Sequence, residues 1–372
     1  MRKNLIIFGT RPEAIKMAPL IKEFNNHPDF QTKVCVTAQH REMLDQVLDF
    51  FDLKPDYDLN LMRPNQNLYS LTADIITQLK TVLEDFVPNF VYVHGDTTTS
   101  MAASIAAFYS GSKVCHIEAG LRTNNKLSPF PEEINRQITS RIADYHFAPT
   151  EISRQNLLNE GISKDDIIIT GNTVIDALLI SKERVANLNS KEINSLKNLL
   201  NSDKKTILVT GHRRENHGEG FINICEALKQ IALEFPDVQI VYPVHLNPHV
   251  RKPVYEILSE IKNIFLILPL SYPAFVWMMK ECYIIITDSG GVQEEAPSLG
   301  KPVLVLRDTT ERPEAVQAGT VILVGTDKKK IVNEVTELLK NKKRYAKMAE
   351  LQNPYGDGKA CKRIVNYMQQ IF

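Results

Sequence analysis

Short runs of consecutive apolar residues alternate along the chain with longer segments in which apolar residues recur every three or four positions. The short runs are continuously apolar, which is typical of strands in parallel sheets that helices cover on both faces. We predict strands, in chain order, at residues 4–8, 33–37, 90–94, 113–118, 145–149, 166–171, 205–211, 238–244, 264–269, 283–288 and 301–307.

Helical patterns fill spaces between these strands. We predict helices over residues 12–24, 41–51, 99–109 and 221–235. Strands that alternate with helices favour α/β domains with parallel sheets. Because the strands fall into two sets, we predict an α/β fold of two doubly wound Rossmann-like domains. The border lies in the segment at residues 167–178 and the polar helix that follows it over residues 181–200.

The composition narrows the class of protein. The chain has 372 residues, enough for two domains. Its 44 basic and 44 acidic residues give no net charge, so no basic field would attract nucleic acid or an anionic membrane. The five cysteines form no CxxC pair, which indicates buried thiols in a reducing compartment. No apolar run suits a signal peptide or a membrane span, so we expect a soluble cytoplasmic protein.

Polar residues that directly follow the predicted strands are the first candidates for chemistry. Ligands of open α/β sheets bind beyond the carboxyl ends of the strands, and we expect the active site in a cleft between two facing domains. The segment VYVHGDTTTS places Asp96 at such an end, where burying a carboxylate is costly. Asp96 is either a site residue at the head of a helix that Thr97–Thr99 cap, or only a cap itself.

Other charged residues follow predicted strands in the same way. Arg11 and Lys16, in GTRPEAIK, lie on what we interpret as a strand-to-helix loop, where they would supply positive charge for a phosphate. Glu118 follows a strand in HIEAGLRT, and His212 follows one in TGHRREN. The alternatives are a solvated helix face for Lys16 and a capping role for His212.

The segment TDSGGVQEEA is the clearest binding signal. Gly290 and Gly291 allow a backbone to approach a ligand closely, and a helix that begins near Val292 would offer free N–H groups to a pyrophosphate. Glu294 and Glu295 would fall in its first turn, where a carboxylate can accept hydrogen bonds from a ribose diol. The alternative is a glycine turn before an acidic helix start.

The segment LSPFPEEINR offers two neighbouring carboxylates, Glu132 and Glu133, with Arg136 one turn later. They are either ordinary first-turn residues of a helix that begins after proline, or one of them reaches into the cleft from a loop. The residues alone leave both interpretations open.

Several familiar motifs are missing from the sequence. No GxGxxG follows a strand and no GxxxxGK[ST] is present, which argues against a bound dinucleotide and against a P-loop phosphotransferase. His245 and His249 are spaced by four, but Pro248 disrupts the helical spacing between them, so we expect no metal site.

Motifs spread over nearly the whole chain carry a family resemblance. They include FGTRPEAIKMAPL, HGDTTT, HIEAGLRT, PFPEEINR, GNTVIDAL, VTGHRREN and TDSGGVQEEAPSLGKPVLVLRDTTERPEAV. Together they resemble the non-hydrolysing bacterial UDP-N-acetylglucosamine 2-epimerases. The resemblance implies a glycosyltransferase-B-like fold, with residues 1–168 plus a returning helix at 356–372 as one domain and residues 169–355 as the UDP-binding domain. It also implies a homodimer that supplies UDP-N-acetylmannosamine for surface polysaccharides.

The resemblance also implies roles for single residues. The catalytic positions are Asp96, Glu118, Glu132, Arg136 and His212. The substrate and UDP contacts are Arg11, Lys16, Phe275 near the uracil, Ser289, Gly290, Gly291 and Glu295 at the diphosphate and ribose, and Arg312. Gln39 fits a second, activating site for substrate, although Asn65 stands where some members have arginine. Leu270 stands where the family has a polar side chain that contacts the uracil. Here backbone groups would make that contact instead.

The chemistry of the sugar selects a mechanistic hypothesis. Carbon 2 has no neighbouring carbonyl, so the enzyme must either oxidise carbon 3 or expel UDP from carbon 1. Oxidation needs a nicotinamide, whose fingerprint is missing, so we expect no cofactor and favour elimination to a 2-acetamidoglucal followed by re-addition. Inversion then needs acid–base groups on opposite faces, for which Asp96, Glu118 and Glu132 are the candidates. A hydrolysing epimerase, a glycosyltransferase and a non-catalytic nucleotide-sugar sensor are the alternatives.

Overall fold

The apolar runs form two parallel sheets in a computed structural model that describes residues 1–37, 41–63 and 66–371. One sheet has the strand order β3-β2-β1-β4-β5-β6-β7, and the other has the order β10-β9-β8-β11-β12-β13. The strands of the first sheet are β1 (Arg2–Phe8), β2 (Phe30–Val36), β3 (Tyr57–Asp58), β4 (Phe90–His94), β5 (Lys113–Ile117), β6 (Tyr145–Ala148) and β7 (Ile167–Ile169). Those of the second are β8 (Lys205–Thr210), β9 (Val238–Pro243), β10 (Ile264–Ile267), β11 (Ile284–Thr287), β12 (Val303–Val305) and β13 (Val321–Leu323).

The predicted strands are all present, but two short ones escaped the sequence interpretation. They are β3 and β13, and each lies at an edge of its sheet. An edge strand pairs on one side only, so a run of two or three residues is enough to form it, and such a run carries little hydrophobic signal.

The chain divides into two compact units. Unit 1 comprises Met1–Ala177 and Tyr355–Phe372, and unit 2 comprises Leu178–Pro354. The division falls between Ala177 and Leu178, inside α7 (Thr173–Ala186). The polar helix predicted over residues 181–200 is wrong as a single element. It is broken between α7 and α8 (Lys191–Leu199), because Ser190 starts a new helix as its N-cap.

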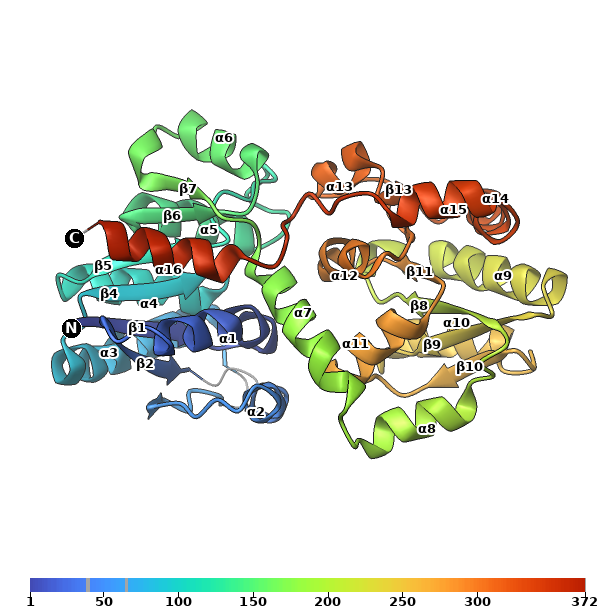
Figure 1. Ribbon diagram of the computed structural model, residues 1–372, viewed down its shortest axis with the longest axis horizontal. Helices are drawn as coiled ribbons and strands as arrows, with labels where there is room; N and C mark the ends of the chain where they lie inside the picture. Colours follow the sequence, from blue (N-terminus) through green and yellow to red (C-terminus); the bar gives the residue numbers. More distant parts are fainter. Residues whose placement is uncertain (38–40, 64–65, 372) are drawn as a thin grey trace. The chain divides into compact units, whose positions relative to one another are not determined.

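Helices cover both faces of the unit 1 sheet. Leu5 and Val91 point to α3 and α4 and share one apolar cluster with them. On the opposite face Phe24 of α1 packs on Tyr92, with ring centroids 5.0 Å apart. The last helix, α16, lies beside α1, as Figure 1 shows. The helices are α1 (Arg11–Asn25), α2 (Arg41–Phe50), α3 (Leu68–Phe86), α4 (Thr98–Tyr109), α5 (Glu132–Ile142), α6 (Glu151–Asn159) and α16 (Ala360–Gln370), with a 3-10 turn at Lys164–Asp166.

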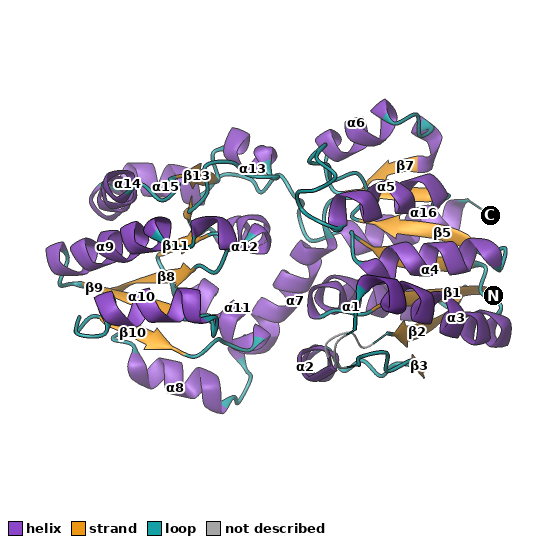
Figure 2. Ribbon diagram, turned by 180° about the vertical axis from the view of Figure 1, so that it is seen from behind, coloured by secondary structure: helices purple, strands orange, loops and turns teal. Residues whose placement is uncertain are grey.

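Unit 2 has the same layered construction (Figure 2). Its core joins the buried sides of β8, β9 and β11 to α9, α10 and α14. The helices are α8, α9 (Glu219–Glu234), α10 (Pro248–Leu258), α11 (Tyr272–Glu281), α12 (Gly290–Glu295), α13 (Pro313–Ala318), α14 (Lys328–Lys340) and α15 (Lys342–Ala349), with 3-10 turns at Arg214–Asn216 and Ala296–Leu299. Within the described part of the chain, no helix combines the length and apolar character that a bilayer span requires.

The strand orders mark where a ligand would bind to each unit. Successive strands run outward in opposite directions from β1 and β4 in unit 1, and from β8 and β11 in unit 2. Doubly wound sheets bind their ligands beyond the carboxyl ends of the strands at this switch point. The segments that follow these four strands are therefore the places to look for a site.

Candidate active site

Asp96 lies just beyond β4 and is held by an arginine from α5. Its Oδ2 accepts hydrogen bonds from Arg136 Nε at 3.0 Å and from a terminal guanidinium nitrogen at 2.7 Å, and Asn135 Nδ2 donates to its backbone oxygen at 2.9 Å. The N-cap of α4 is Thr97, whose side chain accepts the N–H of Ser100. The interpretation of Asp96 as a helix cap is therefore wrong, and its carboxylate faces a cation instead.

Glu118 lies beyond the neighbouring strand, β5, in a left-handed backbone conformation with φ of 62°. Its Oε2 pairs with Lys16 Nζ, accepts a hydrogen bond from Asn172 Nδ2 at 2.7 Å, and lies 3.6 Å from His94 Nε2. Burial alone would raise the pKa of Glu118, but Lys16 and His94 outweigh it and hold that pKa well below its usual value. Glu118 is therefore an ionised carboxylate at neutral pH, held by a cation and an amide.

Arg11 and Lys16 both belong to α1, as the helix predicted over residues 12–24 implied for Lys16, so the interpretation of their segment as a strand-to-helix loop is wrong. The helix begins at Arg11, with Pro12 in its first turn, and Lys16 lies in its second turn. Proline lacks a backbone N–H, and in the first turn of a helix that N–H would have no partner within the helix. Pro12 therefore suits the start of α1. The helix thereby carries Lys16 to Glu118.

Glu13 is a buried acidic residue that the sequence interpretation missed. Its Oε2 accepts hydrogen bonds from the backbone N–H groups of Gly9 and Thr10, and its Oε1 accepts them from the hydroxyls of Thr97 and Ser100. The carboxylate thus ties the start of α1 to the start of α4, and so joins the segments that carry Lys16 and Asp96. The T-R-P-E spacing of a capping box was the available signal.

The structure separates the two carboxylates that the sequence left equivalent. Glu133 accepts the backbone N–H groups of Thr123 and Asn124 and pairs with Arg136 at 3.0 Å. Burial alone would raise the pKa of Glu133, but these donors outweigh it and lower that pKa. Glu132 starts α5, and among the described residues no donor reaches its buried Oε2. Glu133 is thus a structural residue, and Glu132 has an acceptor atom left for chemistry.

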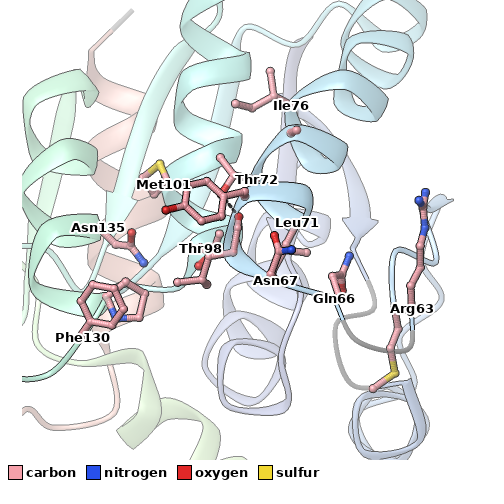
Figure 3. Close-up of a pocket in the computed structure, with 15 residues that line it drawn as sticks. Arg63, Gln66, Asn67, Leu71, Thr72, Ile76, Thr98, Met101, Phe130 and Asn135 are labelled. Carbon is pink, nitrogen blue, oxygen red and sulfur yellow. Dashed lines mark hydrogen bonds between the residues drawn. The ribbon is translucent and has the colours of Figure 1, made fainter.

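A cavity of about 1230 Å³ opens in unit 1 beside α3, α4 and α5 (Figure 3). Its lining includes Arg63, Gln66 and Asn67 before α3, Thr98 and Met101 from α4, and Phe130 and Asn135 near the start of α5. Asn135 connects this cavity to the segment of Asp96. Gln39, the residue expected at a second substrate site, and Asn65 lie outside the described residues.

In unit 2, a buried aspartate that the sequence interpretation did not assign to the site orients His212. Asp288 Oδ2 accepts the N–H groups of His212 and Arg213, both at 2.8 Å, and Oδ1 lies 3.4 Å from His212 Nδ1. The His212 ring stacks on His245 with centroids 5.4 Å apart. Burial, with repulsion from His245 and Arg213, lowers the pKa of His212 although Asp288 opposes this effect. His212 is therefore a neutral imidazole at neutral pH, with nearly half of its side chain exposed.

The glycine-rich segment of unit 2 faces an arginine. The helix α12 begins at Gly290 after Ser289 as N-cap, so the start predicted near Val292 is wrong and Glu295 ends the helix rather than opening it. A Cβ on Gly290 would lie 2.5 Å from the guanidinium carbon of Arg312. This glycine therefore allows the guanidinium to lie against the backbone at the start of α12.

Carboxylates fix the arginines around this segment. Arg312 Nε donates to Glu294 Oε1 at 2.7 Å, and the guanidinium also pairs with Glu311 at 2.8 Å. Burial would raise the pKa of Glu311, but Arg312 and Arg307 lower it to about 2. Phe275 is half-buried in the first turn of α11. The described residues contain no group of three or more histidine, cysteine or acidic side chains that could hold a metal ion.

Comparisons with known proteins agree on one family. A family model described as UDP-N-acetylglucosamine 2-epimerase matches residues 22–369. A UDP-N-acetylglucosamine 2-epimerase from Campylobacter jejuni is 57% identical over 373 residues, which cover 99% of this chain and 97% of that protein. The UDP-GlcNAc 2-epimerase from Neisseria meningitidis, solved with UDP-GlcNAc bound, is 55% identical with a TM-score of 0.92, covering 99% of this chain and 100% of that one.

A more distant solved structure has the same fold. The UDP-GlcNAc 2-epimerase from Methanocaldococcus jannaschii, in complex with UDP-GlcNAc and UDP, is 35% identical with a TM-score of 0.81. The alignment covers 99% of both chains. Both domains of the present chain are thus accounted for by this likeness.

Proposed function

Because the chain belongs to the UDP-N-acetylglucosamine 2-epimerase family, we propose that it interconverts UDP-N-acetylglucosamine and UDP-N-acetylmannosamine by inverting carbon 2. The observation that carries this proposal is the pair of carboxylates Asp96 and Glu118 beyond the adjacent strands β4 and β5. Each has its own cationic partner, Arg136 and Lys16 respectively. Inversion requires two acid–base groups, one for each face of the sugar ring, and two separately held carboxylates meet that requirement.

The reaction we propose has two balanced steps. In the first, a carboxylate takes the proton from carbon 2, the C2–H electron pair forms the double bond, and the C1–O bond breaks with its electrons passing to the β-phosphate of UDP. In the second, the β-phosphate oxygen of UDP attacks carbon 1 of the 2-acetamidoglucal, and another acid protonates carbon 2 from the opposite face. No electrons leave the substrate, so this route uses no redox cofactor.

Glu118 suits the role of proton acceptor in one direction. Lys16 and Asn172 stabilise its ionised form, and both would also hold the carboxylate in place during transfer. Asp96 and Glu132 are the candidates for the opposite face, and Arg136 would keep Asp96 oriented.

Unit 2 supplies groups suited to the uridine diphosphate. Arg312 beside Gly290, with Ser289 and Gly291, would bind the diphosphate, and Glu295 would accept hydrogen bonds from the ribose. Charge that develops on departing UDP is best stabilised by preorganised cations and N–H groups. The carboxylates that fix Arg312 provide that preorganisation. Arg11 and His212 would contact the diphosphate or sugar, and Phe275 would lie at the uracil.

Proton NMR of the purified protein with UDP-N-acetylglucosamine alone tests the function. We expect UDP-N-acetylmannosamine at equilibrium with the starting sugar, and slow leakage of 2-acetamidoglucal with UDP. Free N-acetylmannosamine as the main product would indicate a hydrolysing enzyme. Binding without turnover would indicate a sensor, and turnover only with an added acceptor would indicate a glycosyltransferase.

The family further suggests a homodimer and a role in surface polysaccharide synthesis, and we include both in the proposal. Exposed apolar side chains on α3 and α4 and at their ends support the dimer: Tyr69 is 89% exposed, Tyr109 76% and Val87 65%. Val87 and Tyr109 line one hollow of the surface, and exposed apolar side chains that lie together are typical of an interaction site. Sedimentation velocity would give the oligomeric state directly.

A further inference from the structure

Asn172 is a buried residue that contacts both Glu118 and the segment returning to unit 1. Its Nδ2 donates to Glu118 Oε2 at 2.7 Å, its Oδ1 accepts the N–H of Val174 at 3.0 Å, and its own N–H donates to Tyr355 O at 2.7 Å. Only 2% of the residue is exposed. The N–H of Val174 can donate only to the side-chain oxygen of Asn172. The side-chain NH₂ group of Asn172 must therefore face Glu118.

We propose that Asn172 is a positioning residue for Glu118, which holds this carboxylate for its proton transfer and ties it to the returning segment at Tyr355. This inference rests on the proposed function. Glu118 has two kinds of partner. Among the described residues, Lys16 and His94 face it with charged or titratable side chains, whereas Asn172 contributes a neutral donor of fixed direction. A neutral amide can orient the carboxylate without adding a positive charge beside it.

The tie to the returning segment is close. Tyr355 is the first residue of unit 1 after the chain returns, and it is 1% exposed. Gly171 has a φ of +85°, and a Cβ there would lie 3.2 Å from Tyr355 O. The same junction is held by Arg363, which donates to Thr170 O at 3.0 Å. A displacement of Tyr355 would therefore move the backbone of Asn172, and with it the donor that holds Glu118.

The hydrogen bond from Asn172 determines in which direction the pKa of Glu118 should change when it is removed. A hydrogen bond donated to a carboxylate favours its ionised form. Without the amide of Asn172, the pKa of Glu118 rises, and the carboxylate becomes protonated at a higher pH than in the native protein. Lys16 and His94 still face Glu118 and limit the rise.

The test compares Asn172→Ala and Asn172→Asp with the native protein. We expect kcat to fall about 10–100-fold with KM changed less than about threefold, since the contact acts on the proton transfer rather than on substrate binding. The acid limb of the kcat/KM profile should move up by about one pH unit, and further for Asn172→Asp, which sets a second carboxylate against Glu118.

A matched control separates positioning from stability. Asn263→Ala removes a side-chain amide that donates to Ala232 O and Val238 O in unit 2. We expect it to lower Tm while leaving the acid limb unchanged. Gly171→Ala disturbs the Tyr355 contact without touching Glu118, and should lower kcat in the same direction by a smaller factor. Asn172→Ser, which retains a hydroxyl donor, should recover part of the lost kcat, and it takes the place of Asn172→Ala if that variant does not fold.

A readout independent of activity decides the inference by itself. Carbon-13 NMR of labelled glutamate side chains, with Glu118→Gln used for assignment, follows the titration of Glu118 in the native and Asn172 variants. Titration curves and acid limbs that coincide with those of the native protein would overturn the inference. If the native protein does not epimerise, the proposed function fails, yet the titration still shows whether Asn172 acts on Glu118.

Discussion

The two units place different chemistry at the same position of the same kind of sheet. In unit 1, Asp96 and Glu118 lie beyond neighbouring strands and each pairs with a cation. In unit 2, the strand-end carboxylate Asp288 is fully buried and accepts backbone N–H groups, while Arg312 lies over Gly290. Unit 1 therefore presents carboxylates paired with cations, and unit 2 presents an arginine against the start of a helix and an imidazole beside a buried carboxylate. A shared fold fixes where a site lies, and the partners of its charged side chains decide what that site does.

We expect the largest loss of activity from variants of the two carboxylates of unit 1. Glu118→Gln and Asp96→Asn should each lower kcat by about 10²–10⁴-fold, the usual contribution of a general acid or base. UDP affinity, measured by calorimetry, should stay within about threefold of the native value, because neither carboxylate is among the groups proposed to bind UDP. Glu160→Gln is the control, since Glu160 pairs with Arg122 outside the site. Near-native kcat in either site variant would remove that residue from the mechanism.

The link between the segments of unit 1 is the next target. Glu13→Gln places an NH₂ group among donors that need an acceptor, and one unsatisfied buried group costs about 1–3 kcal/mol. We expect the free energy of unfolding in urea to fall by about that amount, together with a fall in kcat, because Glu13 joins the segments of Lys16 and Asp96. Unchanged kcat in the folded variant would show that Glu13 serves stability alone.

Acid should affect unit 1 before unit 2. His116 is fully buried in β5, its Nε2 lies 2.8 Å from the oxygen of Gly95 in the turn before Asp96, and burial lowers its pKa to about 3. A histidine with a lowered pKa in the folded state makes the protein less stable in acid. The loss begins as the pH falls below the unfolded pKa of about 6.5 and is complete near the folded pKa of about 3. Between pH 7 and pH 5 the loss from His116 should be about 2 kcal/mol. The measurement is urea unfolding at both pH values, with hydrogen exchange to locate the unit that opens.

His146 adds to the same effect, because burial lowers its pKa to about 4. His116→Gln should therefore reduce the pH dependence without abolishing it. Equal exchange rates in the two units at pH 5 would contradict the comparison.

The smallest expected effect concerns the anion site of unit 2. A methyl group at Gly290 would lie 2.5 Å from the Arg312 guanidinium, which is the mobile end of a long side chain. Gly290→Ala should therefore displace the guanidinium rather than unfold the protein, and UDP affinity should fall about tenfold, the equivalent of about 1.4 kcal/mol. Calorimetric titration with UDP measures the change. A native Kd with an unchanged Tm would mean that Arg312 makes no contact with UDP.

Interpretation of the sequence located the ends of the strands better than the contacts that side chains make there. Continuous apolar runs and helical periodicity are local properties, so they sufficed for every strand except the short edge strands β3 and β13, and for the positions of Asp96 and Glu118 beyond two strands. Helix boundaries were less accurate. The break before Ser190 and the start of α12 at Gly290 depend on capping and on backbone conformation, which a periodic pattern describes poorly.

The sequence by itself determined two parallel α/β domains, the polar strand ends and the family. Only the tertiary structure decided which donor holds which carboxylate: Arg136 for Asp96, Lys16 and Asn172 for Glu118. Strand and helix patterns extend over neighbouring residues and can be read along the chain. The partners of a buried charge come from distant segments that meet only after folding, and their hydrogen bonds compensate its desolvation there.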